Sequence, residues 1–259
     1  MPILIQQITK IYRDRHGRTL EALADVDFAI RDREFLTILG PSGSGKTTLL
    51  NIIAGLLSPS SGRVVFSGAG LNGRPLTSVV FQEGALFPWR TVEKNIQYGL
   101  EENGYGKNER KQVAADFMQL VGLSEFADRY PHQLSGGLKQ RAALARALAV
   151  NPYLLLMDEP FSALDAQTRM LLQAELSRIW EKARNSVLYI THNIREAVFL
   201  SDRVLLLSSR PGRILDLVTI DLPRPRNEQV AREAAFQNYV DFLWERIKVQ
   251  AREALEADW

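Results

Sequence analysis

The residues with the clearest chemical potential form a glycine-rich segment in the N-terminal part of the chain. The segment matches the pattern G-x-x-x-x-G-K-[ST] without a mismatch and consists of Gly40, Pro41, Ser42, Gly43, Ser44, Gly45, Lys46 and Thr47. Its glycines allow the backbone to curl so that successive N–H groups point at phosphate oxygens. We expect Lys46 to reach the β- and γ-phosphates and Thr47 to ligate Mg²⁺. Thr48 belongs to the same site because it opens a predicted helix, whose N-terminal end is positive.

Two acidic residues supply what a phosphate site needs for hydrolysis. Asp158 and Glu159 directly follow the apolar run Leu154–Met157. We expect Asp158 to hold Mg²⁺ through water, and Glu159 to polarise the attacking water molecule. An apolar strand that ends in two acids fits a solvated strand end equally well when it is taken alone. Together with the phosphate loop, the pair predicts a hydrolytic site.

Two further polar residues also follow predicted strands. Gln82 follows the run 78–81, and His192 follows the run 187–191. Ligands of open parallel sheets gather at the carboxyl ends of the strands, so Gln82 is expected to contact the metal or the attacking water. His192 is expected to donate a hydrogen bond to the γ-phosphate. A lone histidine is more often structural, but a place at the same sheet edge as Glu159 favours the functional interpretation.

The surrounding elements alternate between strands and helices, which predicts a parallel sheet with helices on its faces. Strands are expected over the first thirty residues, most clearly at 26–30, and at 35–39, 63–66, 78–81, 154–157, 187–191 and 203–207. Helices are expected at 48–57, 136–149, 166–183 and 194–200. Another helix, starting near Glu109, has an apolar face. A last helix is expected in the tail, with Phe236, Val240, Leu243 and Ile247 on one side. Before it, the Arg224/Arg226 run is expected to be a solvated connector.

Composition narrows the function classes. The 259 residues suffice for one large domain or two small ones, and the 32 Lys and Arg against 30 Asp and Glu leave a net charge of +2. This balance argues against binding nucleic acid by bulk charge and against a polybasic membrane anchor. Because there is no cysteine, disulfides, thiolate zinc sites and iron–sulfur clusters are excluded. The segment Met1–Gln7 does not have the pattern of a signal peptide, and no apolar run approaches the roughly 20 residues of a membrane-spanning helix.

The segment 134–140 links these features to a family. Ser135 is a natural N-cap for the helix that follows, and Gly136 and Gly137 leave backbone N–H groups open to an anion. Taken with the phosphate loop, Gln82, the run 154–159, the segment 162–165 and His192, the order and spacing resemble those of ATP-binding-cassette (ABC) ATPases. The resemblance covers roughly residues 1–220.

The resemblance implies a fold class and a domain division. The fold is an α/β P-loop NTPase with a RecA-like, mostly parallel sheet, an antiparallel β subdomain and an inserted α-helical subdomain. It places a nucleotide-binding domain at 1–222, with the helical subdomain at approximately 84–150, and a C-terminal helical extension at 223–259. Tyr12 resembles the aromatic residue that stacks on adenine; the alternative is an ordinary strand tyrosine.

The resemblance also implies a dimer of two copies that enclose ATP and Mg²⁺. Ser135, Gly136 and Gly137 of one copy would contact the γ-phosphate held by the other, and Asp165 would lie across the interface. One position departs from the family pattern, because Leu138 stands where glutamine is common.

Four short segments, 86–92, 163–169, 210–214 and 222–226, resemble the ATPase subunits of nitrate, sulfonate, taurine and bicarbonate importers. This resemblance implies an ATP-hydrolysing subunit at the cytoplasmic face of the cell membrane, with a separate permease and, indirectly, a solute-binding protein as partners. Phe87 and Trp89 would then form part of an apolar groove for the permease, or else fill the core of the helical subdomain. The alternatives are a non-transport ABC ATPase that acts on nucleic acid or ribosomes, and a P-loop kinase, which would not explain the segment 134–140.

Overall fold

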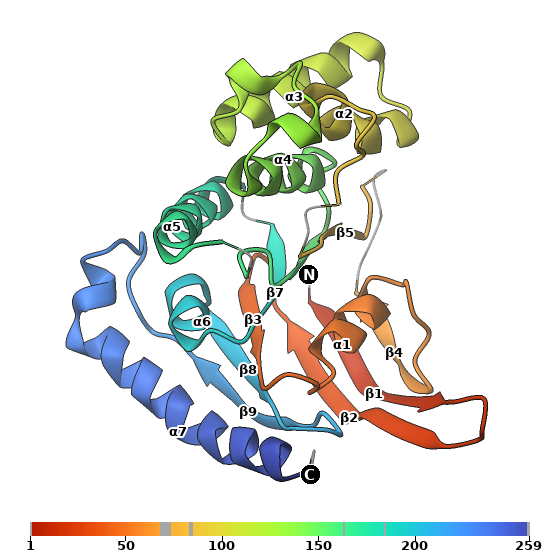
Figure 1. The fold of residues 1–259 in the computed structure, drawn as a ribbon, viewed down its shortest axis with the longest axis vertical. Helices are drawn as coiled ribbons and strands as arrows, with labels where there is room; N and C mark the ends of the chain where they lie inside the picture. Colours follow the sequence, from red (N-terminus) through yellow and green to blue (C-terminus); the bar gives the residue numbers. More distant parts are fainter. Residues whose placement is uncertain (1, 68–73, 83–84, 163, 184, 258–259) are drawn as a thin grey trace. The chain divides into compact units, whose positions relative to one another are not determined.

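The computed structural model describes residues 2–67, 74–82, 85–162, 164–183 and 185–257 (Figure 1). Ala163, Gly84 and the last two residues, which belong to segments discussed above, lie outside the described residues. The chain forms two compact units, one made of Met1–Ala69 with Ser186–Trp259 and the other of Gly70–Asn185.

The first unit contains a three-stranded antiparallel sheet. Its strands are β1 (Ile3–Arg13), β2 (Thr19–Ile30) and β4 (Ser61–Phe66), in the order β2-β1-β4. Val26, Phe28 and Ile30 of β2 are buried. The alternation of apolar residues in the sequence therefore correctly predicts which side chains of β2 are buried.

The same unit contains parallel strands. β3 (Phe35–Leu39) lies between β7 (Ser186–Thr191) and β8 (Arg203–Leu207) and pairs with both in parallel, whereas β9 (Ile214–Thr219) pairs with β8 in antiparallel fashion. All residues of β3, β7 and β8 are buried, which explains why these strands are mainly apolar in the sequence. The helices α1 (Lys46–Ile53) and α6 (Ile194–Leu200) follow β3 and β7.

The C-terminal part of the first unit is a long helix. After a short 3₁₀ turn, η3 (Val230–Arg232), α7 (Ala234–Ala257) runs alongside α6 (Figure 1). Phe236, Leu243 and Ile247 of α7 are buried, as the expected apolar side predicts. Arg195 of α6 covers the ring of Phe236 and donates a hydrogen bond to Gln237.

The second unit contains two parallel strands and four α-helices among its described residues. β5 (Thr77–Val80) pairs with β6 (Leu154–Asp158). The helices are α2 (Val92–Glu102), α3 (Lys107–Leu120), α4 (Gly136–Ala149) and α5 (Ala166–Ala183), with short 3₁₀ turns η1 (Ser124–Phe126) and η2 (Pro131–Gln133) between α3 and α4. α2, α3 and α4 pack on one another.

Three elements differ from the sequence-based expectation. The helix expected at 48–57 begins at Lys46 and ends at Ile53, because Gly55 adopts a φ of 74° that ends the helix. α2 and β9 were not predicted. α2 is amphipathic, and Thr91 is its N-cap, so local signals for this helix were present in the sequence. β9 is recognisable only through its pairing with β8, because its own residues do not alternate clearly.

The expectation of a solvated connector at Arg224 and Arg226 is wrong. Only 4% of Arg226 is exposed, and its guanidinium donates hydrogen bonds to the backbone carbonyls of Val198, Phe199, Ser201, Ile220 and Leu222. Arg224 donates to the carbonyl of Leu200 and forms an ion pair with Asp202. Carbonyl groups at a helix C-terminus have no hydrogen-bond donors within the helix. At the end of α6, these two arginines provide the donors.

Replacing Arg226 with alanine is expected to lower the free energy of unfolding by about 3 kcal/mol, because it leaves several buried carbonyl groups without a donor. The measurement is urea denaturation followed by circular dichroism. Arg232→Ala is the control, since Arg232 forms an exposed pair with Glu228 and such pairs contribute about 0–1 kcal/mol. Equal losses for the two variants would contradict the structural role of Arg226.

Candidate functional site

The phosphate loop connects β3 to α1. Gly43 and Gly45 have φ values of 76° and 86°, in the left-handed region that glycine adopts without strain. Lys46 is 6% exposed, and its Nζ donates hydrogen bonds to the carbonyls of Gly40, at 2.9 Å, and Pro41, at 2.8 Å. The loop therefore curls around its own lysine, as a cradle for phosphate requires.

Gly45 lies at a close approach between two backbone segments. A methyl group added to its Cα would lie 2.8 Å from the carbonyl oxygen of Ala22 and 2.7 Å from a methyl group of Leu23, both on β2. Since the carbonyl cannot rotate away from such a contact, only glycine fits here. The antiparallel sheet thus fixes the position of the phosphate loop at Gly45, the residue directly before α1.

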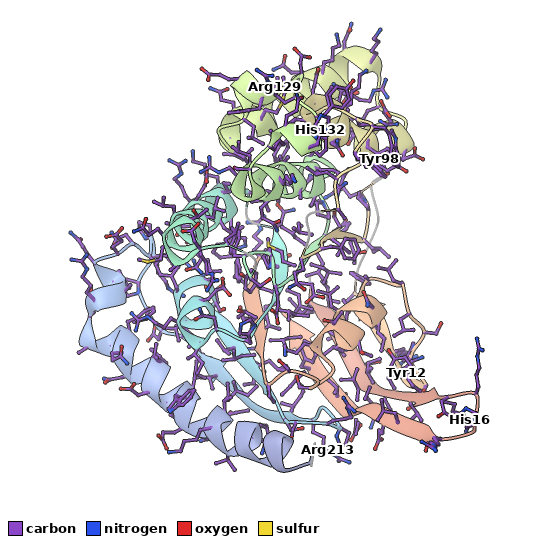
Figure 2. All side chains as sticks on the ribbon, viewed as in Figure 1. Tyr12, His16, Tyr98, Arg129, His132 and Arg213 are labelled. Atoms are coloured by element: carbon purple, nitrogen blue, oxygen red, sulfur yellow. The ribbon has the colours of Figure 1, made fainter. Side chains whose placement is uncertain are left out.

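Tyr12 and His192 approach this loop from two different strands of the same unit. Tyr12 lies on β1 (Figure 2), and its hydroxyl is 3.3 Å from Oγ1 of Thr48, in the first turn of α1. Its ring is partly exposed, so an aromatic face is available beside the loop. His192 is exposed and directly follows Thr191, which pairs with Leu39. His192 and Gly40 therefore leave the sheet side by side.

Gln82 and Glu159 are brought together in the second unit. Val80 pairs with Met157, so each of the two polar residues stands two positions beyond a paired residue at the carboxyl end of its strand. Gln82 is exposed, and Glu159 is half-buried with a φ of 43°. The parallel register explains why residues that are far apart in the sequence reach the same edge.

Ser162 connects Gln82 with Glu159, and sequence reasoning did not single it out for this role. Its Oγ accepts a hydrogen bond from Nε2 of Gln82 at 2.9 Å and donates one to the carbonyl of Glu159 at 3.0 Å. Arg169 of α5 holds the same loop by donating to the carbonyls of Phe161 and Leu164. Ser162 lies in the segment 162–165, which is included among the family motifs of the sequence. Its two hydrogen-bond partners could not be predicted, because they depend on how the loop folds.

The segment at the start of α4 lies next to the loop before α5. The side chain of Ser135 accepts a hydrogen bond from the N–H of Leu138, which confirms the predicted N-cap. Ser135 and Gly136 are exposed, and a methyl group on Gly136 would lie 3.4 Å from Leu164. Asp165 accepts a hydrogen bond from the N–H of Thr168 at 2.9 Å, and this bond lowers the pKa of the Asp165 carboxyl.

The donor set expected for Mg²⁺ is a hydroxyl, an amide and a carboxylate, from Thr47, Gln82 and Asp158. Mg²⁺ prefers oxygen ligands and keeps several of its waters, so a few protein oxygens together with phosphate oxygens suit it. Thr47 and Gln82 are exposed and Asp158 is half-buried. Among the described residues, no group of three or more His, Asp or Glu side chains forms a self-contained metal site. The oxygen donors that each unit contributes are thus of the chemical type that Mg²⁺ prefers.

Gly45→Ala is expected to abolish nucleotide binding and to lower stability, because the added methyl group would collide with the Ala22 carbonyl. Gly17→Ala is the matched control. Gly17 also has a positive φ, of 78°, but nothing lies within 4 Å of the position of an added methyl group, so only the backbone cost of about 1 kcal/mol applies. Fluorescent-nucleotide titration and thermal unfolding measure both effects. Similar behaviour of the two variants would show that the close contact at Gly45 does not matter.

Comparison with known proteins supports the arrangement of these motifs. The family model described as ABC transporter matches residues 23–162. An uncharacterised ABC transporter ATP-binding protein of Methanocaldococcus jannaschii is 52% identical over 86% of this chain and 84% of its own length. The nitrate import ATP-binding protein of Synechocystis is 41% identical over 99% of both chains. The taurine import ATP-binding protein of Rhizobium johnstonii is 45% identical over 85% of this chain and 84% of its own length.

A solved structure shows the same fold. It is the dimeric structure of a post-hydrolysis state of an ATP-binding cassette bound to ADP and phosphate, with 32% sequence identity and a TM-score of 0.73 over 84% of this chain and 98% of that one. The predicted α/β P-loop NTPase fold is thereby confirmed. None of the described helices is long and apolar enough to span a membrane. With the phosphate loop, the acidic pair and these relatives in agreement, the chain belongs to the ABC transporter family and is one of its ATP-binding, ATP-hydrolysing proteins.

Proposed function

We propose that this protein is the ATP-hydrolysing subunit of an importer that takes up a small solute through a separate membrane permease. The observation that carries the proposal is the phosphate loop 40–47, which opens α1 beside β3 and β7 in a chain whose relatives are named as import ATP-binding proteins. The relatives named for nitrate and taurine favour a small oxyanion as the solute, of the class that also includes other sulfonates and bicarbonate.

In this proposal the nucleotide is bound mainly by the first unit. The ring of Tyr12 stacks on adenine, and its position beside Thr48 supports this role. The loop residues 40–47 donate backbone N–H groups to the phosphates, and Lys46 exchanges its carbonyl partners for the β- and γ-phosphates. Thr47, Asp158 and Gln82 would hold Mg²⁺, whose charge would neutralise that of the phosphate oxygens.

Three residues serve the hydrolytic step. Glu159 orients the attacking water and accepts its proton. Its backbone carbonyl accepts a hydrogen bond from Ser162, which supports a fixed backbone position for this residue. His192 donates a hydrogen bond to the γ-phosphate, and Gln82 contacts the metal or the water. The register of β5 with β6 and of β7 with β3 supports these assignments, because each places its residues at a carboxyl strand end.

The functional form is a dimer of two copies that face each other across ATP. Ser135, Gly136 and Gly137 of one copy contact the γ-phosphate bound by the other, and Asp165 lies at the interface. The exposure of Ser135 and Gly136 at the N-terminus of α4 supports this, because such a helix end attracts anions. The related cassette structure is dimeric.

The permease docks on the second unit, at the cytoplasmic face of the membrane, and a solute-binding protein acts through the permease. Trp89 is 70% exposed, which disfavours a core role for this residue. Phe87 packs against Trp89 and Tyr98, with ring centroids 5.4 and 4.6 Å away. An exposed tryptophan beside two half-buried aromatic rings suits contact with an apolar segment of another protein.

The alternative, action on nucleic acid or ribosomes, has little support. The net charge of +2 offers only a small excess of cations for phosphate backbones, and the relatives compared above are named for transport. Purification from membranes distinguishes the two functions. A co-purifying permease supports import, whereas bound RNA or ribosomes would support the alternative.

Glu159→Gln is expected to reduce ATP turnover by about 100-fold or more, because the amide cannot accept the proton of water. ATP binding is expected to persist, and the variant should accumulate as an ATP-bound dimer. Phosphate release, nucleotide titration and size-exclusion chromatography with ATP measure these quantities. Turnover close to that of the unaltered protein would remove Glu159 from its proposed role.

Ser162→Ala is expected to lower kcat about threefold to tenfold with little change in KM, because two hydrogen bonds that position Gln82 and Glu159 are lost. Ser162→Thr retains the hydroxyl and is expected to remain within about twofold of the unaltered kcat. Steady-state ATPase kinetics on both variants give the answer. If the threonine variant were as slow as the alanine variant, shape rather than hydrogen bonding would explain the loss.

A further inference from the structure

The connection between β8 and β9 lies directly against the phosphate loop. It comprises residues 208–213, a segment that the proposed function does not use. A methyl group on Gly212 would lie 2.2 Å from the carbonyl oxygen of Ser44, so the two backbones are in close contact. Gly212 is also tied to β2, because its N–H donates to Ala22 and its carbonyl accepts from the N–H of Ala24, each at 3.0 Å. The connection is therefore fixed relative to the loop.

Hydrogen bonds within the connection fix its shape. The hydroxyl of Ser208 donates to the carbonyl of Pro211 and accepts from the N–H of Arg213, both at 2.9 Å. The N–H of Ser208 donates to the carbonyl of Arg213, also at 2.9 Å. The residues at the tip, Ser209 and Arg210, are consequently presented from a closed turn.

Arg210 extends from this turn to the phosphate loop. Its Nη2 lies 3.3 Å from the position that a Cβ of Gly43 would occupy. Arg210 is exposed, and no carboxylate in the described part of the chain forms an ion pair with it. Lys46, by contrast, is buried and donates to carbonyls of its own loop. Arg210 is thus an exposed positive charge at the outer side of a loop that receives a highly charged anion.

The C-terminal helix holds the residue next to Arg210. Oε1 of Gln250, on α7, accepts hydrogen bonds from the N–H of Ser209 at 3.1 Å and from its hydroxyl at 3.4 Å. Arg246, one turn earlier, forms an ion pair with Asp216 of β9 at 3.0 Å. α7 is therefore attached to both the connection and the strand that follows it.

We propose that Arg210 is an additional phosphate-binding residue of the nucleotide site and that Gln250 is its positioning residue. The inference rests on the proposed binding of ATP phosphates by the loop 40–47. A guanidinium carries five N–H donors in a planar fork and suits phosphate oxygens. Its charge adds to that of Lys46, and the attraction grows with the number of phosphates on the ligand. The C-terminal helix thereby affects nucleotide affinity without touching the nucleotide.

The test uses the full-length protein and compares Arg210→Ala with Arg213→Ala. Arg213 lies on the same connection (Figure 2) and is also exposed. Both variants remove one positive charge from the same turn, but only Arg210 reaches the phosphate loop. Calorimetric titration with ATP and with ADP, each at low and high salt, measures the affinities.

Arg210→Ala is expected to weaken ATP binding about threefold to tenfold at low salt and to weaken ADP binding less. The difference should shrink at high salt, because the exposed charge is screened. Arg210→Lys should retain part of the affinity, and Arg213→Ala should match the unaltered protein. Gln250→Ala should reduce the affinity in the same salt-dependent way but by a smaller factor, a pattern that a purely structural defect would not follow.

Equal ATP affinities for Arg210→Ala and Arg213→Ala at low salt would overturn the inference. A loss for Arg210→Ala that is independent of salt and equal for ATP and ADP would also overturn it, because it would indicate a distorted loop. Lys46→Ala distinguishes failure of this inference from failure of the proposed function. If Lys46→Ala abolishes ATP binding while Arg210→Ala does not alter it, only this inference fails. If Lys46→Ala leaves ATP binding intact, the proposed function fails as well.

Discussion

The close contact of the phosphate loop with two other backbone segments is the constraint on which the first unit depends. β2 approaches the loop at Gly45 and the β8–β9 connection approaches it at Gly212, and neither position has room for a side chain. The same carbonyl, that of Ala22, faces Gly45 and accepts the hydrogen bond of the Gly212 N–H. A loop held on both sides has its N–H groups oriented before any phosphate arrives, so binding costs little ordering entropy.

The second requirement is strand register, because it decides which polar residues meet. Pairing of Val80 with Met157 brings Gln82 level with Glu159, and pairing of Leu39 with Thr191 brings His192 level with Gly40. Hydrogen bonding between parallel strands therefore places residues that are distant in the sequence next to each other at the carboxyl ends of the strands. Loop contacts then refine the arrangement, as the two hydrogen bonds of Ser162 do in the second unit.

The C-terminal segment is attached to the rest of its unit by contacts that its polar composition does not reveal. Arg226 is buried because the carbonyl groups of Val198, Phe199 and Ser201, at the end of α6, need donors. Beyond it, α7 is attached through Arg195, Arg246 and Gln250 to α6, to β9 and to the turn that carries Arg210. A segment that ends the chain is thus connected, in few steps, to the phosphate loop.

Much of this protein follows from its sequence alone. The phosphate loop, the acidic pair at the end of β6, the N-cap at Ser135 and the buried strands are local patterns. Phosphate cradles, helix caps and strands each need particular residues at adjacent or regularly spaced positions. The family resemblance and the fold followed from the order of these local patterns. Only the tertiary structure decided the burial of Arg226, the pairing of β9, the link through Ser162 and the approach of Arg210 to Gly43. These features join residues that are remote in the chain, and no local pattern specifies a partner that folding alone brings near.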